Sequence, residues 1–125
     1  MTRPAAALRA ALVLLAFASA SDAEAHSELL ASEPADGATV GASPGRIVLR
    51  FTAPMRVTSL RLLDGAGREH PLRREGSRAA PAEEVRAAPA APLPYGAYRV
   101  EYRGVSADGH VGGGAVGFRV EPARR

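Results

Sequence analysis

The chain has 125 residues and a formal net charge of +3 at pH 7, and all 16 of its basic residues are arginine. The absence of cysteine excludes disulfides and thiolate metal sites. The arginines are scattered along strand-like segments instead of forming a basic stripe with aromatic residues, which argues against nucleic-acid binding.

The first 25 residues have the layout of an export signal. Arg3 and Arg9 give a positively charged start, and the apolar run "ALVLLAFA" follows. The apolar stretch from Ala10 to Ala18 is too short to span a bilayer, which needs roughly 20 apolar residues. We therefore expect residues 1–25 to be a signal peptide, and no membrane anchor in the exported product.

The cleavage site decides which residue begins the mature protein. The triplet Ala23-Glu24-Ala25 suits signal peptidase, and cleavage after it leaves residues 26–125 as a single domain that starts with His26. The alternative triplet, Ala18-Ser19-Ala20, follows the apolar run directly and would leave Ser21 at the terminus.

After residue 26 the apolar residues recur with a period close to two, which is typical of half-buried strands. In "GRIVLRF" the apolar positions alternate with Val48 and Arg50, and the segments "AYRVEYR" and "AVGFRV" repeat the alternation. The residues expected to point inward are Ile47, Leu49, Phe51, Tyr98, Val100, Tyr102, Val116, Phe118 and Val120.

Turn signals separate these segments. The sequence Asp64-Gly65-Ala66-Gly67 predicts a hairpin between two short strands. "SRAAPAEEVRAAPAAP" is the weakest region, and its prolines indicate a loop around a short strand near Val85. About seven short strands predict an all-β fold, an immunoglobulin-like β-sandwich or Greek-key barrel.

Asp108 and His110, in "SADGHVGGG", are the first candidate metal ligands. They are two residues apart, so on an extended backbone both side chains project from the same face. A carboxylate and an imidazole on one face form half of a metal site. The alternative is an ordinary turn, because Asp-Gly is a common turn dipeptide.

His26 becomes a candidate ligand if cleavage makes it the first residue. A terminal histidine offers its α-amine and its ring Nδ1 as a chelate, and the reference pKa of such an amine, roughly 7.7–8.0, lets a metal displace the proton near neutrality. With His110 and Asp108, the site would hold nitrogen ligands and one carboxylate, a set that in a tetragonal arrangement favours Cu(II). The alternative for His26 is a frayed polar end.

Three segments carry a family resemblance: "HSELLASEPADGATV", "SPGRIVLRFTAPM" and "LPYGAYRVEYRGVSADGHVGGGAVGFRV". In order and spacing they resemble the CopC family of secreted copper-resistance proteins over essentially all of residues 26–125. The resemblance implies an immunoglobulin-like β-barrel that binds Cu(II) in the periplasm. It also implies that the Cu(II) ligands are His26 (amine and ring), Asp108 and His110.

Two positions depart from the family pattern. Some members carry a methionine-rich loop for Cu(I), whereas Met55 is the single methionine after residue 25 and is expected to be a core or loop residue. Many members have an acidic residue at the position of Ala53, so the surroundings of the copper site are expected to differ here.

The remaining polar candidates are assigned structural roles. His70 is expected to be an exposed strand histidine and not a ligand, and Glu28 a solvated side chain close to the site. Tyr95, Tyr98 and Tyr102 are expected to be core and corner residues, because 98 and 102 follow the inward phase of their strand.

Together these observations predict a monomeric, soluble periplasmic protein that sequesters or carries Cu(II) for copper homeostasis or resistance. The resemblance implies an inner-membrane copper transporter as partner and no catalytic activity. Two alternatives stay open: a metal-free immunoglobulin-like interaction module, and a copper oxygenase of the kind in which a terminal histidine and a second histidine hold copper on a β-sandwich.

Overall fold

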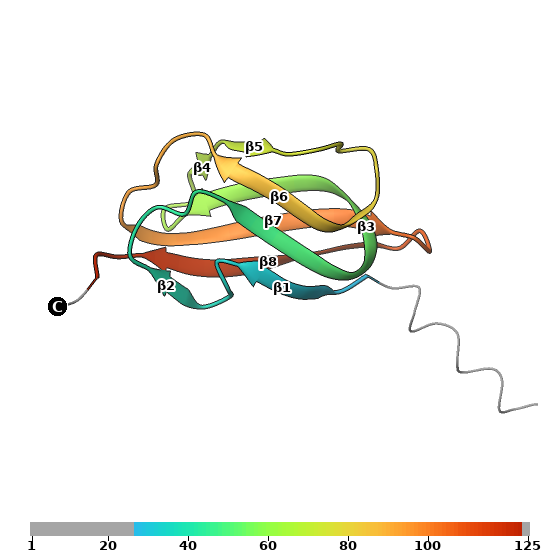
Figure 1. Cartoon of the computed structure of the whole chain (residues 1–125), viewed down its shortest axis with the longest axis horizontal. Coiled ribbons are helices and arrows are strands. Elements are labelled where there is room, and N and C mark those ends of the chain that lie inside the picture. Colours follow the sequence, from blue (N-terminus) through green and yellow to red (C-terminus); the bar gives the residue numbers. More distant parts are fainter. Residues whose placement is uncertain (1–26, 124–125) are drawn as a thin grey trace, which may run out of the picture.

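The computed structural model describes residues 27–123, and this part of the chain is built of strands and turns without a helix. It therefore contains no helix that could cross a membrane. The strands are β1 (Leu29–Glu33), β2 (Ala38–Val40), β3 (Ile47–Asp64), β4 (Glu69–His70), β5 (Leu72–Arg74), β6 (Ala82–Pro89), β7 (Gly96–Ser106) and β8 (Val111–Val120) (Figure 1).

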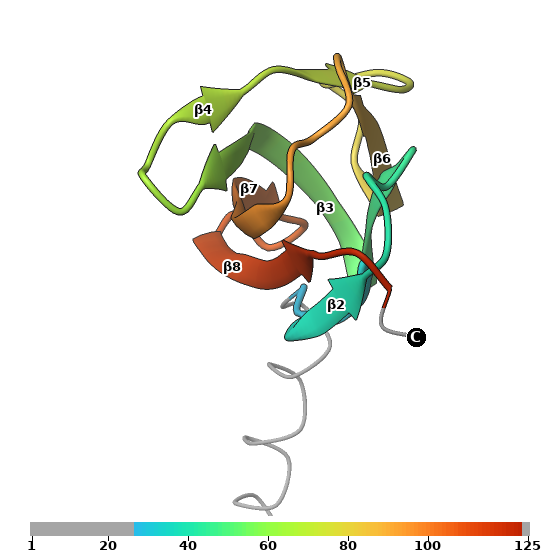
Figure 2. The same ribbon diagram turned by 90° about the vertical axis from the view of Figure 1, so that its left-hand side faces the viewer.

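β3 organises the fold because it pairs with four other strands. Its first half pairs antiparallel with β1 and β6, and its second half pairs antiparallel with β7 and β4. The main path of the sheet runs β2-β8-β7-β3-β6-β5. Since one long strand serves both halves, the sheet curls around a core, as the end-on view shows (Figure 2). The expected all-β sandwich is confirmed.

The core consists of two clusters enclosed by the curled sheet. All nine residues expected to point inward are buried. Val48 departs from the expected alternation, because it is only 3% exposed although it lies on the opposite face of β3 from Leu49. Glu33 of β1 and Arg86 of β6 flank it in the sheet. A strand with neighbours on both sides can therefore bury a small apolar residue on its outer face.

Two local expectations need correction. Tyr95 was expected to be a core or corner residue but is 65% exposed. Tyr98 occupies the corner, and its hydroxyl donates a hydrogen bond to the Pro94 carbonyl oxygen at 2.6 Å. The strand near Val85 extends over all of β6, because it pairs with both β3 and β5. The proline Pro89 stands at its last position, where it ends the strand.

The strands place two groups of polar residues at opposite ends of the molecule. The β7–β8 turn and the first described residues lie at one end (Figure 1). The β3–β4 turn and the start of β7 lie at the other end. The candidate ligands Asp108 and His110 belong to the first end, and His70 belongs to the second.

Candidate metal centre

The turn between β7 and β8 brings Asp108 and His110 together. The Ser106 amide donates to the His110 carbonyl oxygen at 3.0 Å, and the Gly109 amide donates to the Ser106 carbonyl oxygen at 2.9 Å. Gly109 has a φ of +87°, a left-handed conformation that glycine adopts without steric cost. The expectation of an extended backbone is therefore wrong, and a tight turn accounts for the shared face.

The two side chains of the pair form a direct contact. His110 Nδ1 lies 2.7 Å from Asp108 Oδ2, and the His110 backbone amide donates to Asp108 Oδ1 at 3.2 Å. The imidazole side chain is 69% exposed while the carboxylate side chain is 18% exposed. The carboxylate thus orients a ring whose outer edge faces solvent.

Ser106 is the polar neighbour that sequence reasoning missed. Its hydroxyl donates a hydrogen bond to Asp108 Oδ1. This bond is the main cause that holds the pKa of Asp108 well below its ordinary value, with further contributions from the backbone amide and ring of His110. Asp108 is therefore ionised at neutral pH, the form in which a carboxylate binds metal. The signal in the sequence was a serine two residues before the aspartate, within reach of a local side-chain bond.

His110 also lines a surface hollow of about 270 Å³. Ser27, the first described residue, lines it together with His110. The other lining residues are Met55, Ser106, Val111 and Gly112. Met55 is 3% exposed, which confirms the expectation of a core residue. Residues far apart in the sequence therefore meet around one opening.

Hydrogen bonds hold the start of the described chain against β3. The Ser27 hydroxyl donates to the Pro54 carbonyl oxygen at 2.8 Å, and the Glu28 amide donates to Thr52 Oγ1 at 3.0 Å. The Thr52 amide in turn donates to the Glu28 carbonyl oxygen at 2.8 Å. The Glu28 side chain is exposed, as expected. His26 lies outside the described residues, but its covalent neighbour is fixed beside His110.

The donor chemistry of the pair fits a copper ion in part. Residues 27–123 contain no group of three or more His, Cys, Asp or Glu side chains that could hold a metal. Asp108 and His110 supply one oxygen and one nitrogen, 2.7 Å apart. Ligands bound at roughly 2.0–2.1 Å on adjacent corners of a square lie about 2.9 Å apart, so the spacing suits one ion once the hydrogen bond opens and both groups turn toward it. A third His, Cys, Asp or Glu ligand would have to come from outside the described residues.

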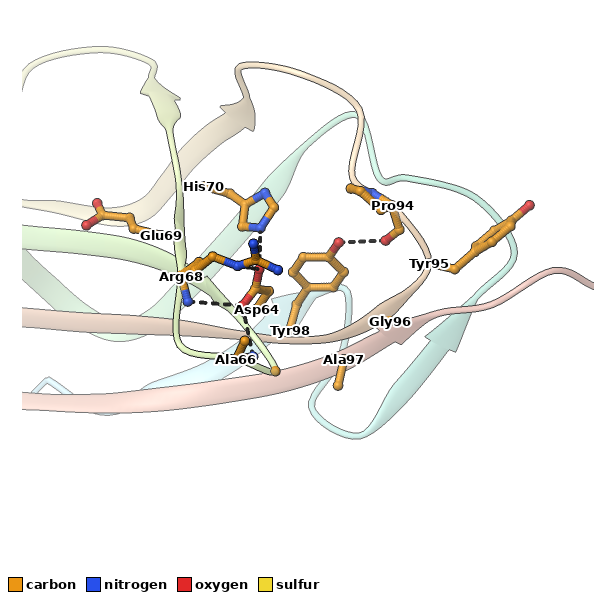
Figure 3. Close-up of a pocket in the computed structure, with 11 residues that line it drawn as sticks. Asp64, Ala66, Arg68, Glu69, His70, Pro94, Tyr95, Gly96, Ala97 and Tyr98 are labelled. Carbon is orange, nitrogen blue, oxygen red and sulfur yellow. Dashed lines mark hydrogen bonds and ion pairs between the residues drawn. The ribbon is translucent and has the colours of Figure 1, made fainter.

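His70 occupies a separate site at the opposite end of the molecule. Its Nε2 lies 3.0 Å from Asp64 Oδ2, and its ring stacks edge-on against Tyr98 with centroids 5.4 Å apart (Figure 3). The hydrogen bond from His70 is the largest of the contacts that lower the pKa of Asp64 to about 2. The His70 side chain is 25% exposed, so the expectation of an exposed histidine is wrong.

Comparisons with known proteins point to one family. A family model of the CopC domain matches residues 29–121. Copper resistance protein C of Xanthomonas campestris pv. juglandis is 36% identical over 117 residues, which cover 88% of this chain and 91% of the relative. Copper resistance protein C of Pseudomonas syringae pv. tomato is 34% identical over 106 residues, which cover 79% of this chain and 83% of the relative.

Solved structures with the same fold carry related names. The crystal structure of CopC from Methylosinus trichosporium OB3b matches with a TM-score of 0.68 and 30% identity, covering 80% of this chain and 98% of that one. The crystal structure of PcoC, a methionine-rich copper resistance protein from Escherichia coli, matches with a TM-score of 0.65 and 28% identity, covering 78% of this chain and 100% of that one.

Proposed function

The chain belongs to the CopC family, and on this premise we propose that it is a periplasmic Cu(II)-binding protein that sequesters or carries copper. One observation supports the proposal above the others: His110, which is hydrogen-bonded to Asp108, lines the same hollow as Ser27. The proposed ligands are the amine and ring of His26, the carboxylate of Asp108 and the imidazole of His110.

Export would create the site. Residues 1–25 are the proposed signal peptide, and residues 26–125 are the copper-binding domain. Cleavage after Ala25 converts the His26 nitrogen from a peptide amide into an α-amine, which can bind a metal once its proton is displaced. Ser27 lines the same hollow as His110, which supports a ligand at the preceding position in the sequence. The metal site therefore forms after the protein has left the cytoplasm.

The ligand set favours Cu(II) over Cu(I). Imidazole and amine nitrogens with a carboxylate oxygen suit a tetragonal Cu(II) site, whereas Cu(I) prefers thioether and thiolate sulfurs. Met55 is the single methionine after the signal segment, and its side chain is buried in the core. The proposal therefore covers one Cu(II) ion and no exchange between oxidation states within the protein.

The proposed role is that of a carrier and not of an enzyme. The pair lies at an exposed turn at one end of the molecule, where an incoming protein can reach the ion directly (Figure 1). We propose a monomer that exchanges copper with an inner-membrane copper transporter and contributes to copper homeostasis and resistance.

Native mass spectrometry of the exported protein with one equivalent of Cu(II) tests this proposal. The expected spectrum shows a chain that begins at His26 and retains one copper. His110→Ala should lower the Cu(II) affinity by orders of magnitude, while the control His70→Ala at the opposite end should retain it. A chain that begins at Ser21, or one that begins at His26 without copper, would favour a metal-free interaction module.

A further inference from the structure

β8 has an open edge next to the proposed copper site. Along one side it pairs with β7 from Val111 to Val120. On its other side lies β2 (Figure 2), which pairs with it only at 118–120. β1 pairs with β3 instead. Within residues 27–123, no strand therefore covers the outer edge of 111–115, and these five residues are all exposed.

The backbone groups at this edge can be assigned from the turn. The Ser106 amide bonds to the His110 carbonyl, so these two residues form a hydrogen-bonded pair. In an antiparallel ladder such pairs alternate with pairs whose backbone groups point away from each other. The register has no bulge, so the amides and carbonyls of Val111, Gly113 and Ala115 point away from β7.

Gly117 confirms this assignment and shows how the edge is used further along. Its amide donates to Asp36 Oδ1 at 2.9 Å, and its carbonyl accepts from the Gly37 amide at 2.7 Å. Gly117 has the same phase in the strand as Val111, Gly113 and Ala115. The segment before β2 thus occupies this edge at Gly117. The backbone amides and carbonyls of Val111, Gly113 and Ala115 point the same way and can pair with another chain.

The side chains beside the open edge define the chemistry of a partner. Arg103 is the cross-strand neighbour of Gly113, and its Cγ lies 3.2 Å from the position that a Cβ on Gly113 would take. No carboxylate of the described chain forms a salt bridge with Arg103, whereas Arg99 and Arg119 on the same face are each paired with a glutamate. Next to the turn, Val111 is 68% exposed.

We propose that the open edge of β8 at 111–115 binds an extended, acidic segment of a partner protein by strand addition. Backbone hydrogen bonds to the edge supply affinity, and side chains of the added strand supply selectivity. An acidic residue of the partner would lie beside Arg103, and an apolar residue two positions away would cover Val111. A second copy of this chain fits less well, because antiparallel pairing about Gly113 would bring two Arg103 side chains together.

The open edge of β8 lies beside the proposed metal site, so a partner bound there could exchange copper with it. Val111 follows His110 directly and lines the same hollow, so an added strand would run to the edge of the proposed metal site. This use rests on the proposed function, but the docking surface itself does not require copper. Binding measured on the metal-free protein therefore separates a failure of this proposal from a failure of copper binding.

The test is an NMR titration of the metal-free exported protein with the blocked octapeptide Thr-Val-Thr-Glu-Thr-Glu-Thr-Ser. We expect shifts centred on the amides of Val111, Gly113 and Ala115. Arg103→Gln should weaken binding about two- to fivefold, as loss of an exposed ion pair does, while Arg73→Gln on β5 should not. Ala115→Pro removes an outward-pointing amide without breaking the β7 ladder and should abolish binding.

Two control peptides make the outcome decisive. A peptide with N-methylated alternate amides should not bind, because its donors are blocked, and a peptide with lysine in place of glutamate should bind more weakly. Equal binding of the N-methylated peptide, or shifts located away from 111–115, would overturn strand addition. Concentration-dependent shifts at the same amides without peptide would identify a second copy as the occupant and overturn the acidic partner.

Discussion

Ser106 and Asp108 are joined by a hydrogen bond within the β7–β8 turn, in which the serine hydroxyl donates to the carboxylate. Ser106 is 8% exposed and, apart from two tyrosines, is the one buried residue of the described chain with a polar side chain. Its position at the end of β7 fixes the carboxylate before any metal arrives. The end of β7 therefore holds the Asp108 carboxylate in the orientation in which it contacts His110.

Ser106→Ala should weaken Cu(II) binding without abolishing it. Loss of a side chain that orients a metal ligand typically lowers metal affinity about 10- to 100-fold. The pKa of Asp108 should also rise toward the ordinary value of 3.8, because its main hydrogen-bond donor is gone. Chelator competition measures the affinity, and carboxyl NMR follows the pKa. Ser77→Ala, in an exposed loop, is the control, and unchanged copper affinity in Ser106→Ala would refute a positioning role.

Copper affinity should fall steeply as the solution becomes acidic. The proposed ligands include an α-amine and imidazole nitrogens, and groups of these types have reference pKa values of roughly 7.7–8.0 and 6.5. Protons therefore compete with the ion, and binding should weaken below about pH 6. Asp108 should not contribute to this loss, because its lowered pKa keeps it ionised throughout. Competition titrations from pH 5 to pH 8 test the prediction, and a flat profile would contradict the nitrogen ligands.

The sequence predicted the strands well because burial in a curled sheet alternates locally. Tyr98, Val100 and Tyr102 follow one another at every second position and all point into the core. The alternation did not predict the exposure of Tyr95, because this residue precedes β7 and the strand period does not apply there. For the same reason the pattern could not reveal the geometry of Asp108 and His110. Their contact depends on a left-handed Gly109, which period-two reasoning does not describe.

Residues outside any motif were the hardest to predict. Ser106 belongs to the strand pattern as an inward position, so its hydroxyl attracted no attention, although its bond to Asp108 shapes the candidate site. The proximity of Ser27 to His110 arises from pairing between the chain start and β3, a contact between residues more than 20 positions apart. Such long-range register could not be obtained from local composition. Ligand chemistry and the family resemblance linked the two segments in advance, but neither described the pairing that brings them together.

Asp64→Asn should remove stability that is present at neutral pH and lost in acid. The folded-state pKa of Asp64 is about 2, below its ordinary value of 3.8. Between these two pKa values the unfolded state binds more protons than the folded state. The contribution of Asp64 to the stability of the fold is therefore complete above about pH 4 and disappears as the pH falls through 2. The urea midpoints of the two proteins should differ most at pH 7 and converge near pH 2.

His70→Ala provides an independent check on that carboxylate. Because the His70 ring is the main cause of the lowered pKa, its removal should raise the pKa of Asp64 toward 3.8 and reduce the pH dependence of stability between 4 and 2. The variant should still bind copper if the proposed ligands are correct. The prediction for Asp64→Asn would be contradicted if its urea midpoint differed from that of the wild type by the same amount at every pH. That result would show that the hydrogen bonds of Asp64 do not depend on its charge.

Two glycines of β8, Gly112 and Gly114, differ in the space available for a side chain. A Cβ on Gly114 would lie 2.7 Å from the Tyr102 hydroxyl oxygen, and the Tyr102 ring is fixed edge-on against Phe51 with centroids 5.4 Å apart. A Cβ on Gly112 would meet no atom within 4 Å. Gly114→Ala should therefore destabilise the protein by about 1–3 kcal/mol, as overpacking does, while Gly112→Ala should be nearly neutral.

Urea unfolding of the two alanine variants distinguishes the causes. If Gly114 is required because the Tyr102 ring occupies the space beside it, only Gly114→Ala should lower the unfolding midpoint, and the second variant Gly114→Ala with Tyr102→Phe should recover part of the loss. The phenylalanine lacks the oxygen that lies nearest the new methyl group. If both single variants lose equal stability, backbone freedom along the strand, and not the position of the tyrosine ring, would explain the glycines.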